Sequence, residues 1–251
     1  MKVFLSSILF SLLCLIPSAG AKETNPASLF QQANAAYRGG DYGQAASLYE
    51  SLIAQDPKEG DLYYNLGDAY FKQGKMGQAL LQYERARKRE PRDHDLLANL
   101  NYVRSLLEYR VEDKRNWYLK AFEAVLAFFT EKEMGIASLA FGVLFWMSWI
   151  FSLYVRPESL WRWKRKTVLV LAALAFSFWV AKELHDRSAQ EAIVMKSQAS
   201  VRYGPSYKDQ VALKLGEGIK VRVTKNAGEW SRIVLANGET GWMAQEEIGI
   251  I

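Results

Sequence analysis

Four aromatic side chains near the end of the chain have the chemistry of a binding surface. They are Tyr203, Tyr207, Trp230 and Trp242. Flat aromatic faces suit sugars and short peptides, so these residues are candidates to line a site for either ligand. The alternative is that Trp230 and Trp242 pack in the core or at the rim of a small domain. The aromatic residues therefore predict a binding role without specifying the ligand.

Catalytic and metal-binding chemistry has little support, because cysteine and histidine are scarce. The single cysteine, Cys14, lies in the N-terminal segment, and His94 and His185 are the only histidines. Cys–His catalysis, disulfides and histidine metal clusters are therefore excluded from the rest of the chain. Serines and carboxylates are plentiful, but they form no catalytic constellation at a recognisable spacing. We expect no enzyme activity, no cofactor and no metal.

The N-terminal segment 1–21 has the pattern of a signal peptide. Lys2 is followed by an apolar run from Val3 to Ile16, and Ala19 and Ala21 have the spacing of a signal-peptidase site. We expect cleavage after Ala21. An uncleaved anchor is the alternative. A lipoprotein is less favoured, because Leu13 precedes Cys14 where a small residue is expected.

Two later apolar runs predict transmembrane helices at 134–155 and 167–184. The first run carries no charge over its whole length. As a helix it would extend about 33 Å at about 1.5 Å per residue, which suffices for a hydrocarbon core of about 30 Å. The second run is uncharged only from Thr167 to Ala181, so a re-entrant or peripheral helix is its alternative. Residues 134–155 and 167–181 contain no Asp, Glu, Lys, Arg or His. Proton relays and ion pathways usually require such residues, which argues against a transporter.

The stretch between these runs, residues 156–166, is strongly basic. Five basic residues and one acid, Glu158, give it a charge of +4 out of the net +5 of the chain. Short basic loops stay in the cytoplasm, which predicts that the chain before the first apolar run and after the second lies on the periplasmic face of a bacterial inner membrane. Because this stretch explains most of the net charge, we expect no nucleic acid partner. The basic residues are Arg156, Arg162, Lys164, Arg165 and Lys166.

An internal repeat with a period of about 34 residues occupies the first third of the chain. The segment from Gly40 to Ala45 aligns with the segment from Gly74 to Ala79, and the same offset relates Tyr49 to Tyr83 and Pro57 to Pro91. The period and the small residues resemble the tetratricopeptide repeat (TPR), a hairpin of two helices. Residues from His94 onward continue the phase as a capping helix. The predicted TPR domain, with two repeats and the cap, covers 26–109.

The TPR resemblance implies a peptide-binding surface. In peptide-binding members of that family, asparagines on the first helix of each hairpin bond the main chain of the ligand. Asn34 and Asn65 have the corresponding spacing of 31, and Asn99 follows Asn65 by 34. Phe30 and Asp95 replace two basic residues of the family's carboxylate clamp, which puts recognition of a C-terminal carboxylate in doubt. The alternative is that the asparagines are ordinary polar surface.

Residues 110–132 form an aromatic-rich amphipathic connector. Trp117, Tyr118, Phe122, Val125 and Phe129 recur at helical spacing. Such a helix could lie along a bilayer surface, or it could pack against the TPR domain. The sequence does not separate these alternatives.

The C-terminal segment, residues 192–251, predicts a small β barrel. Short stretches alternate with the period of a strand, and Asn237-Gly238 is a strong hairpin signal. The run from Ala199 to Ser206, followed by Trp230 and Gly241-Trp242, resembles bacterial SH3-like domains. The fold class is thus multidomain, with α-helical TPR hairpins, two transmembrane helices and a C-terminal SH3-like β barrel.

The order of these parts resembles the BatE-type proteins of the aerotolerance (Bat) operons, as do the stretches 99–104 and 201–206. That resemblance implies a non-catalytic, membrane-anchored scaffold with a role in envelope stress tolerance. It also implies protein partners, including von Willebrand A-domain membrane proteins and other Bat proteins, beside the lipid bilayer. A different function class remains open, in which the SH3-like domain binds peptidoglycan in the cell wall.

Overall fold

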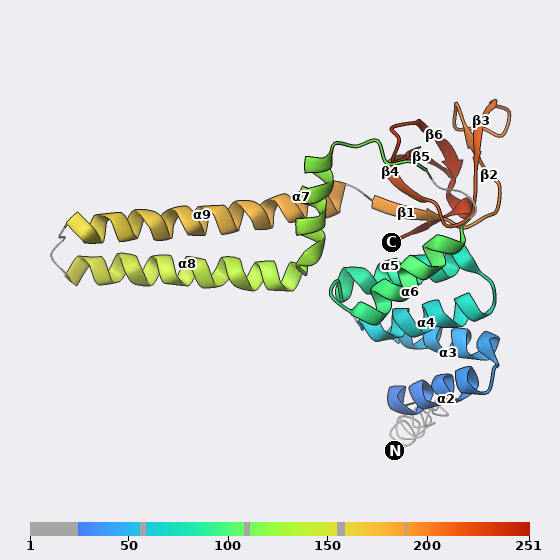
Figure 1. Ribbon diagram of the computed structural model, residues 1–251, viewed down its shortest axis with the longest axis horizontal. Helices are drawn as coiled ribbons and strands as arrows, with labels where there is room; N and C mark the ends of the chain where they lie inside the picture. The colour runs from blue at the N-terminus through green and yellow to red at the C-terminus, as the bar shows by residue number, and fades with distance from the viewer. Residues whose placement is uncertain (1–24, 56–58, 108–110, 155–158, 189) are drawn as a thin grey trace, which may run out of the picture.

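The computed structural model describes residues 25–55, 59–107, 111–154, 159–188 and 190–251. It consists of a stack of helices, a long helical hairpin and a β barrel that lies against the stack (Figure 1). The predicted signal peptide, residues 1–21, lies outside the described residues.

Five helices form the stack, and each packs on the next in sequence order. Their arrangement as successive antiparallel pairs is that of TPR hairpins followed by a further helix (Figure 1). They are α2 (Pro26–Arg38), α3 (Tyr42–Gln55), α4 (Gly60–Lys72), α5 (Met76–Arg89) and α6 (His94–Leu106).

The turn inside each hairpin depends on glycine. Gly40 and Gly74 are related by the repeat period, and they adopt φ angles of +82° and +75°. A side chain would disfavour this left-handed backbone, so glycine lets the chain reverse between α2 and α3 and again between α4 and α5.

Small residues and tyrosines build the core of the stack. Ala33, Ala45 and Ala79 are completely buried, which lets the helices of a hairpin approach closely. A Cβ on Gly67 would lie 2.7 Å from the ring of Tyr83, so glycine there makes room for the tyrosine. The tyrosines at the repeat positions, Tyr49 and Tyr83, are buried as the repeat pattern predicts.

Helix α7 (Trp117–Phe128) is fixed by polar contacts, while much of its apolar face stays exposed. Glu123 accepts hydrogen bonds from Arg115 and from Arg222 of the barrel. Leu126 is buried, whereas Trp117 is 80% exposed. The helix therefore contacts the barrel through Glu123 and Arg222, a contact that neither of the two alternatives named.

Two long helices, α8 (Glu131–Tyr154) and α9 (Ser159–Ser188), lie side by side as a hairpin (Figure 1). Among the residues that the structure describes, no helix is both long enough and apolar enough to cross a membrane. The prediction of transmembrane helices at 134–155 and 167–184 is therefore wrong, and so is the two-span inner-membrane localisation that rested on it.

For α9 the physical reason lies in the charges that the helix includes. Helix α9 includes basic residues in its first turns and Lys182 and Glu183 near its end, so its uncharged part is confined to 167–181. At about 1.5 Å per residue that part is about 22 Å long, short of a hydrocarbon core of about 30 Å.

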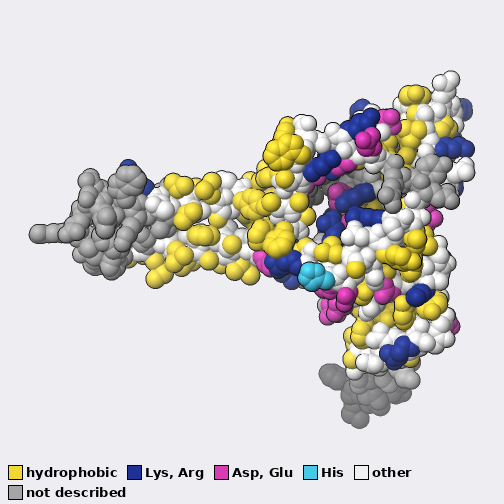
Figure 2. All heavy atoms as spheres, in the orientation of Figure 1, with side chains coloured by type: hydrophobic (Ala, Val, Ile, Leu, Met, Phe, Trp, Pro, Cys, Tyr) yellow, Lys and Arg dark blue, Asp and Glu magenta, His cyan; other side chains and the backbone are white. Residues whose placement is uncertain are grey.

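The basic stretch is also not the loop that the sequence predicted. Arg162, Lys164, Arg165 and Lys166 belong to helix α9, and Arg156 lies outside the described residues. The assignment of a cytoplasmic loop at 156–166 loses its basis, because it required a span on each side. Apolar side chains remain exposed along the hairpin, including Ile136, Leu139 and Leu174, and Figure 2 shows them over its described surface.

The C-terminal domain is a sheet of seven antiparallel strands in the order β3-β2-β6-β5-β4-β1-β7. Its core is formed by inward-facing residues such as Val201, Val221, Ile233 and Met243. The strands are β1 (Gln190–Val194), β2 (Ala199–Arg202), β3 (Val211–Leu215), β4 (Lys220–Ala227), β5 (Trp230–Val234), β6 (Thr240–Ala244) and β7 (Ile248–Ile250).

The predicted hairpin at Asn237-Gly238 joins β5 to β6. Gly238 has a φ of +91°, and the side chain of Asn237 accepts a hydrogen bond from the backbone N–H of Glu239. The turn residues thus fix the register in which Val234 faces Thr240.

Candidate functional site

The three predicted asparagines lie on the first helices of successive hairpins. Asn34 is on α2, Asn65 on α4 and Asn99 on α6, and all three are half-buried. Tyr64 and Asp68 of α4 lie beside Asn99, because the Asn99 amide donates hydrogen bonds to the hydroxyl of Tyr64 at 2.8 Å and to the carboxylate of Asp68 at 3.3 Å. We call these five residues the amide face.

Two buried tyrosines donate hydrogen bonds to side chains of the amide face. The Tyr49 hydroxyl donates to Asn34 Oδ1 at 2.6 Å, and the Tyr83 hydroxyl donates to Asp68 Oδ1 at 2.5 Å. Each bond runs from the second helix of a hairpin to the first. The acceptor side chains are therefore held in place before any ligand binds, as a preorganised site requires.

Part of the hydrogen-bonding capacity of the amide face is unused. The Asn34 side chain accepts a hydrogen bond from Tyr49 but its Nδ2 donates none to a described residue, and the side chain of Asn65 makes no hydrogen bond with any described residue. An amide can donate two hydrogen bonds and accept two. The face thus offers donors and acceptors of the kind that an extended peptide main chain presents.

Burial raises the pKa of two tyrosine hydroxyls at or beside the amide face. Burial and then the charge of Asp68 raise the pKa of Tyr37 and of Tyr64 to about 12. Both tyrosines therefore lie within electrostatic reach of Asp68. Asp68 was not among the predicted site residues, although it corresponds to Asn34 at the repeat period of 34, and that alignment could have pointed to it.

The predicted aromatic residues of the barrel fall into two groups. Tyr203 and Tyr207 lie in the loop after β2 and are 72% and 62% exposed, whereas Trp230 is only 8% exposed. The rings of Tyr207 and Trp230 meet edge to face, with centroids 4.8 Å apart. Trp242, on β6, is half-buried opposite Arg202 of β2. The structure thus brings Tyr207 and Trp230 together and leaves Tyr203 without a ring contact to another described residue.

Polar contacts stabilise the loop after β2. Arg202 donates hydrogen bonds to the carbonyls of Tyr207 and Asp209, and its guanidinium lies 5.8 Å from the centre of the Tyr207 ring. Trp230 is packed as the structural alternative predicted, so the exposed aromatic surface consists of the two tyrosines.

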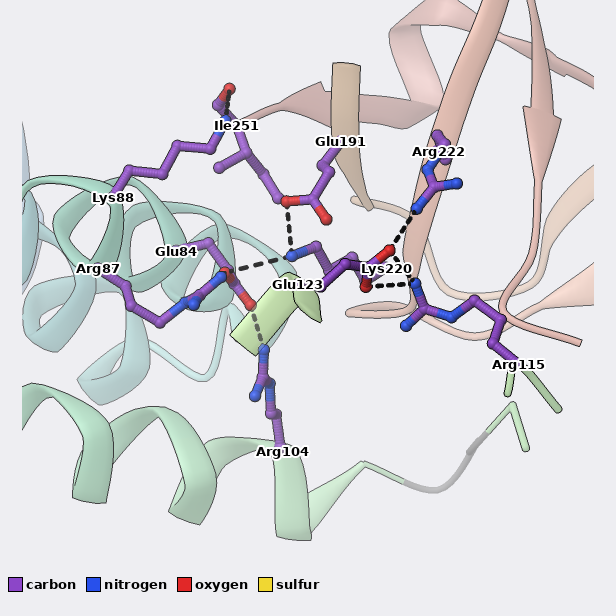
Figure 3. Close-up of polar contacts among 10 residues, drawn as sticks. All are labelled: Glu84, Arg87, Lys88, Arg104, Arg115, Glu123, Glu191, Lys220, Arg222 and Ile251. Atoms are coloured by element: carbon purple, nitrogen blue, oxygen red, sulfur yellow. Dashed lines mark hydrogen bonds and ion pairs between the residues drawn. The ribbon is translucent and has the colours of Figure 1, made fainter. Parts of the chain in front are cut away.

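A third feature, the junction between the helical stack and the barrel, was not predicted from the sequence. Glu84 of α5 is buried and is surrounded by cations from three elements (Figure 3). It pairs with Arg87 of its own helix at 2.9 Å, with Arg104 of α6, and with Lys220 of β4 at 3.6 Å. Lys220 also pairs with Glu191 of β1 at 2.7 Å.

The charges around Glu84 outweigh the cost of burying it. Burial by itself would raise its pKa, but Lys220, Arg87 and Arg104 lower the pKa to about 2. The carboxylate is therefore ionised and its partners are needed to compensate it. Figure 2 shows Lys and Arg side chains gathered between the helical stack and the barrel.

Apolar and backbone contacts complete the junction. Ile193 of β1 belongs to the core of the helical stack, while its neighbours Ala192 and Val194 belong to the core of the barrel. The backbone N–H of Gly77 donates to Glu217 at 2.6 Å, and Arg85 donates to the carbonyl of Ile250 at 2.6 Å. Both faces of β1 are thus covered, one by each domain.

A cavity of about 470 Å³ lies beside this junction. Its lining includes Arg115, Lys120 and Lys220 together with Asp113 and Glu123. These cations are paired with acids, since Arg115 contacts Asp113 and Glu123, and Lys120 contacts Asp113. The cavity therefore has little unpaired charge with which to select a ligand.

Comparisons with known families identify both folded domains. Residues 30–100 match the family described as tetratricopeptide repeat, and residues 195–249 match the family described as bacterial SH3 domain. The predictions of TPR hairpins and of an SH3-like barrel are thus confirmed. Neither match concerns the BatE-type proteins. None of the curated proteins matches the chain.

Solved structures similar to this chain include three TPR domains. The first TPR of Spaghetti (RPAP3) bound to the HSP90 peptide SRMEEVD is 25% identical, with a TM-score of 0.33, over 34% of this chain and 68% of that one. The first TPR domain of human RPAP3 is 25% identical, with a TM-score of 0.31, over 32% and 64%. The Sgt2 TPR domain of Aspergillus fumigatus is 20% identical, with a TM-score of 0.31, over 38% and 71%.

Proposed function

We propose that this protein is a non-catalytic adaptor that captures an extended segment of a protein partner on the amide face. The observation that carries the proposal is the unused hydrogen-bonding capacity of Asn34 and Asn65 on a surface whose other side chains are already held in place. A bound main chain would supply the missing partners, because it presents a donor and an acceptor at almost every residue.

The barrel extends this proposal to a second contact. Tyr203 and Tyr207 present exposed rings on a loop of the barrel, and the junction holds the barrel against the TPR helices. An adaptor with two recognition surfaces in one molecule gains avidity when a single assembly contacts both.

We propose further that the partners belong to a Bat-type envelope assembly, including its von Willebrand A-domain proteins, and that the role is in stress tolerance. Support for this comes from the order of the TPR and SH3-like domains and from the sequence stretches 99–104 and 201–206 that resemble BatE-type proteins.

The substitution Asn65→Ala tests peptide capture. Full-length protein would be titrated with a pool of fluorescent dodecapeptides whose C-termini are amidated. We expect Asn65→Ala to weaken binding about tenfold, because one hydrogen bond contributes about 1–1.5 kcal/mol. Asn101→Ala, on an exposed position of the neighbouring helix α6, is the matched control and should bind like the wild type. Equal affinities for wild type and Asn65→Ala would refute capture on this face.

A second candidate function is binding to the cell wall through the barrel. The exposure of Tyr203 and Tyr207 favours it, since flat rings stack on sugars and short peptides. This function predicts that full-length protein sediments with purified peptidoglycan and that the double substitution Tyr203→Ala, Tyr207→Ala abolishes most of that sedimentation. Protein that stays in the supernatant would eliminate the candidate, and wild-type levels of pelleting by the double variant would eliminate these tyrosines as its site.

A further inference from the structure

Asp68 carries a negative charge that its structural role does not require. It accepts the hydroxyl hydrogen bond of Tyr83, and in the first repeat Asn34 accepts the equivalent bond of Tyr49. The two pairs are related by the repeat period, so the carboxylate of Asp68 can be compared with the amide of Asn34 in the same structural role. A neutral amide holds the first tyrosine at 2.6 Å and a carboxylate holds the second at 2.5 Å. The bond alone therefore does not explain why residue 68 is an acid.

The charge of Asp68 has no cationic partner among the described residues. Its hydrogen bonds come from Tyr83 and from Asn99, both neutral, and both reach the same carboxylate oxygen, Oδ1. Lys72, one turn further along α4, is exposed and forms no ion pair with it. Burial raises the pKa of Asp68, against the smaller lowering by Tyr83, Asn99 and Lys72. A half-buried carboxylate in this position would gain from a cation.

The surroundings of Asp68 also suit a cation rather than an anion. The hydroxyl and amide groups beside it are neutral, and the charges of Asp95 and Asp93 act on Tyr64 from the start of α6. Where a carboxylate clamp would place basic residues, this chain has Phe30 and Asp95. The rings of Tyr37 and Tyr64 lie near Asp68 and can favour a cation over their faces.

We propose that the segment captured on the amide face carries a lysine or arginine whose side chain pairs with the Asp68 carboxylate. This inference rests on the proposed function, because it names the chemistry of the partner that the same surface binds. The asparagines bond the ligand main chain, and Asp68 selects the side chain. The Oδ2 oxygen, which accepts no hydrogen bond from a described residue, is the atom that receives the cation.

The test is a comparison of four peptide pools that differ at one central position. Amidated dodecapeptides with arginine, lysine, norleucine or glutamate at the centre would be titrated against full-length protein. We expect the arginine or lysine pool to bind at least tenfold more tightly than the norleucine and glutamate pools. In Asp68→Asn that preference should fall below threefold, with circular dichroism unchanged, because Asn34 already performs the structural role. Glu239→Gln, which removes an exposed charge on the barrel, should retain the full preference.

A measurement on the wild type keeps the test independent of any variant. Carbodiimide activation would couple the lysine of a bound peptide to the nearest carboxylate, and we expect mass spectrometry to find the bond at Asp68. If the wild type binds all four pools equally, or if Asp68→Asn keeps the tenfold preference, the inference is overturned while peptide capture stands. If no pool binds the wild type, both the inference and the proposed function fail.

Discussion

Replacing Glu84 with alanine should lower the free energy of unfolding by about 3–5 kcal/mol, the usual cost of breaking a buried ion pair by removing one partner. The carboxylate is 1% exposed and compensates Arg87, Arg104 and Lys220 together. Without it, three cations from α5, α6 and β4 face one another across the junction. We therefore expect the loss to be concentrated between the helical stack and the barrel.

Urea unfolding of the full-length protein measures this loss, and hydrogen exchange locates it. Backbone amides of β1 and α5 should exchange faster in Glu84→Ala, because β1 is covered by the stack on one face. Glu239→Ala is the control, since Glu239 is exposed in the turn between β5 and β6. A change below about 1 kcal/mol, the range of an exposed ion pair, would show that Glu84 does not hold the junction.

The same ion cluster predicts a pH dependence with a definite sign. The pKa of Glu84 is lowered from its ordinary value of 4.5 to about 2, because the cations outweigh the effect of burial. A lowered pKa means that the carboxylate stabilises the fold fully above about pH 4.5 and loses that effect as the pH falls toward 2. The difference in stability between wild type and Glu84→Ala should therefore shrink across this interval.

Replacing Gly218 of the barrel with valine should destabilise the protein where the barrel contacts α5. Gly218 has a φ of +83°, and a Cβ there would lie 2.7 Å from Leu80 of α5 and 2.9 Å from Leu107. The left-handed backbone costs a residue with a side chain about 1–2 kcal/mol, and overpacking adds about 1–3 kcal/mol. The second cost arises from the contact between the two domains.

Gly228→Val separates these two costs. Gly228 also has a positive φ, +59°, but a Cβ there has nothing within 4 Å. Gly228→Val should be destabilised only by the cost of the left-handed backbone. In urea unfolding Gly218→Val should therefore be less stable than Gly228→Val by about the overpacking cost. Equal losses in the two variants would mean that the barrel does not press on α5 at this point.

The parts of the fold that repeat or turn could be predicted from the sequence. The repeat period indicates the TPR hairpins, because each hairpin needs small residues and a tyrosine at set positions. Asn237-Gly238 locates the β5–β6 turn, because only a few residue pairs tolerate its backbone. These signals are local, and the physics that produces them acts within one or two neighbouring elements.

The apolar helices and the junction could not be predicted from such local signals. The uncharged centres of the runs at 134–155 and 167–184 favour membrane spans, whereas no described helix is long and apolar enough to span a membrane. Helix α9 includes the charges on either side of its uncharged part. Glu84 looks like any surface acid in a helix that ends in Arg87, Lys88 and Arg89. One signal was available, because the consecutive apolar residues Ala192, Ile193 and Val194 indicate a strand covered on both faces.

The site could be predicted only in part, for a similar reason. The spacing of Asn34, Asn65 and Asn99 predicted three residues of the amide face. Asp68 was recognised as a candidate only from the structure, where its hydrogen bond with Tyr83 can be compared with that of Asn34 with Tyr49. Of the four barrel aromatics, Tyr203 and Tyr207 proved exposed and Trp230 packed. Sequence spacing gives the positions of such residues, whereas their exposure depends on the closed barrel.

The most direct test of the adaptor account is site-specific photocrosslinking in the cell that produces the protein. A benzophenone amino acid would replace Gln31, exposed on α2 one turn before Asn34 of the amide face, in one strain and Ser47, on the exposed side of α3, in another. The account predicts that irradiation gives a discrete protein adduct from position 31 and none from position 47. Adducts of equal yield at both positions, or an adduct at position 47 alone, would contradict capture of a partner on the amide face.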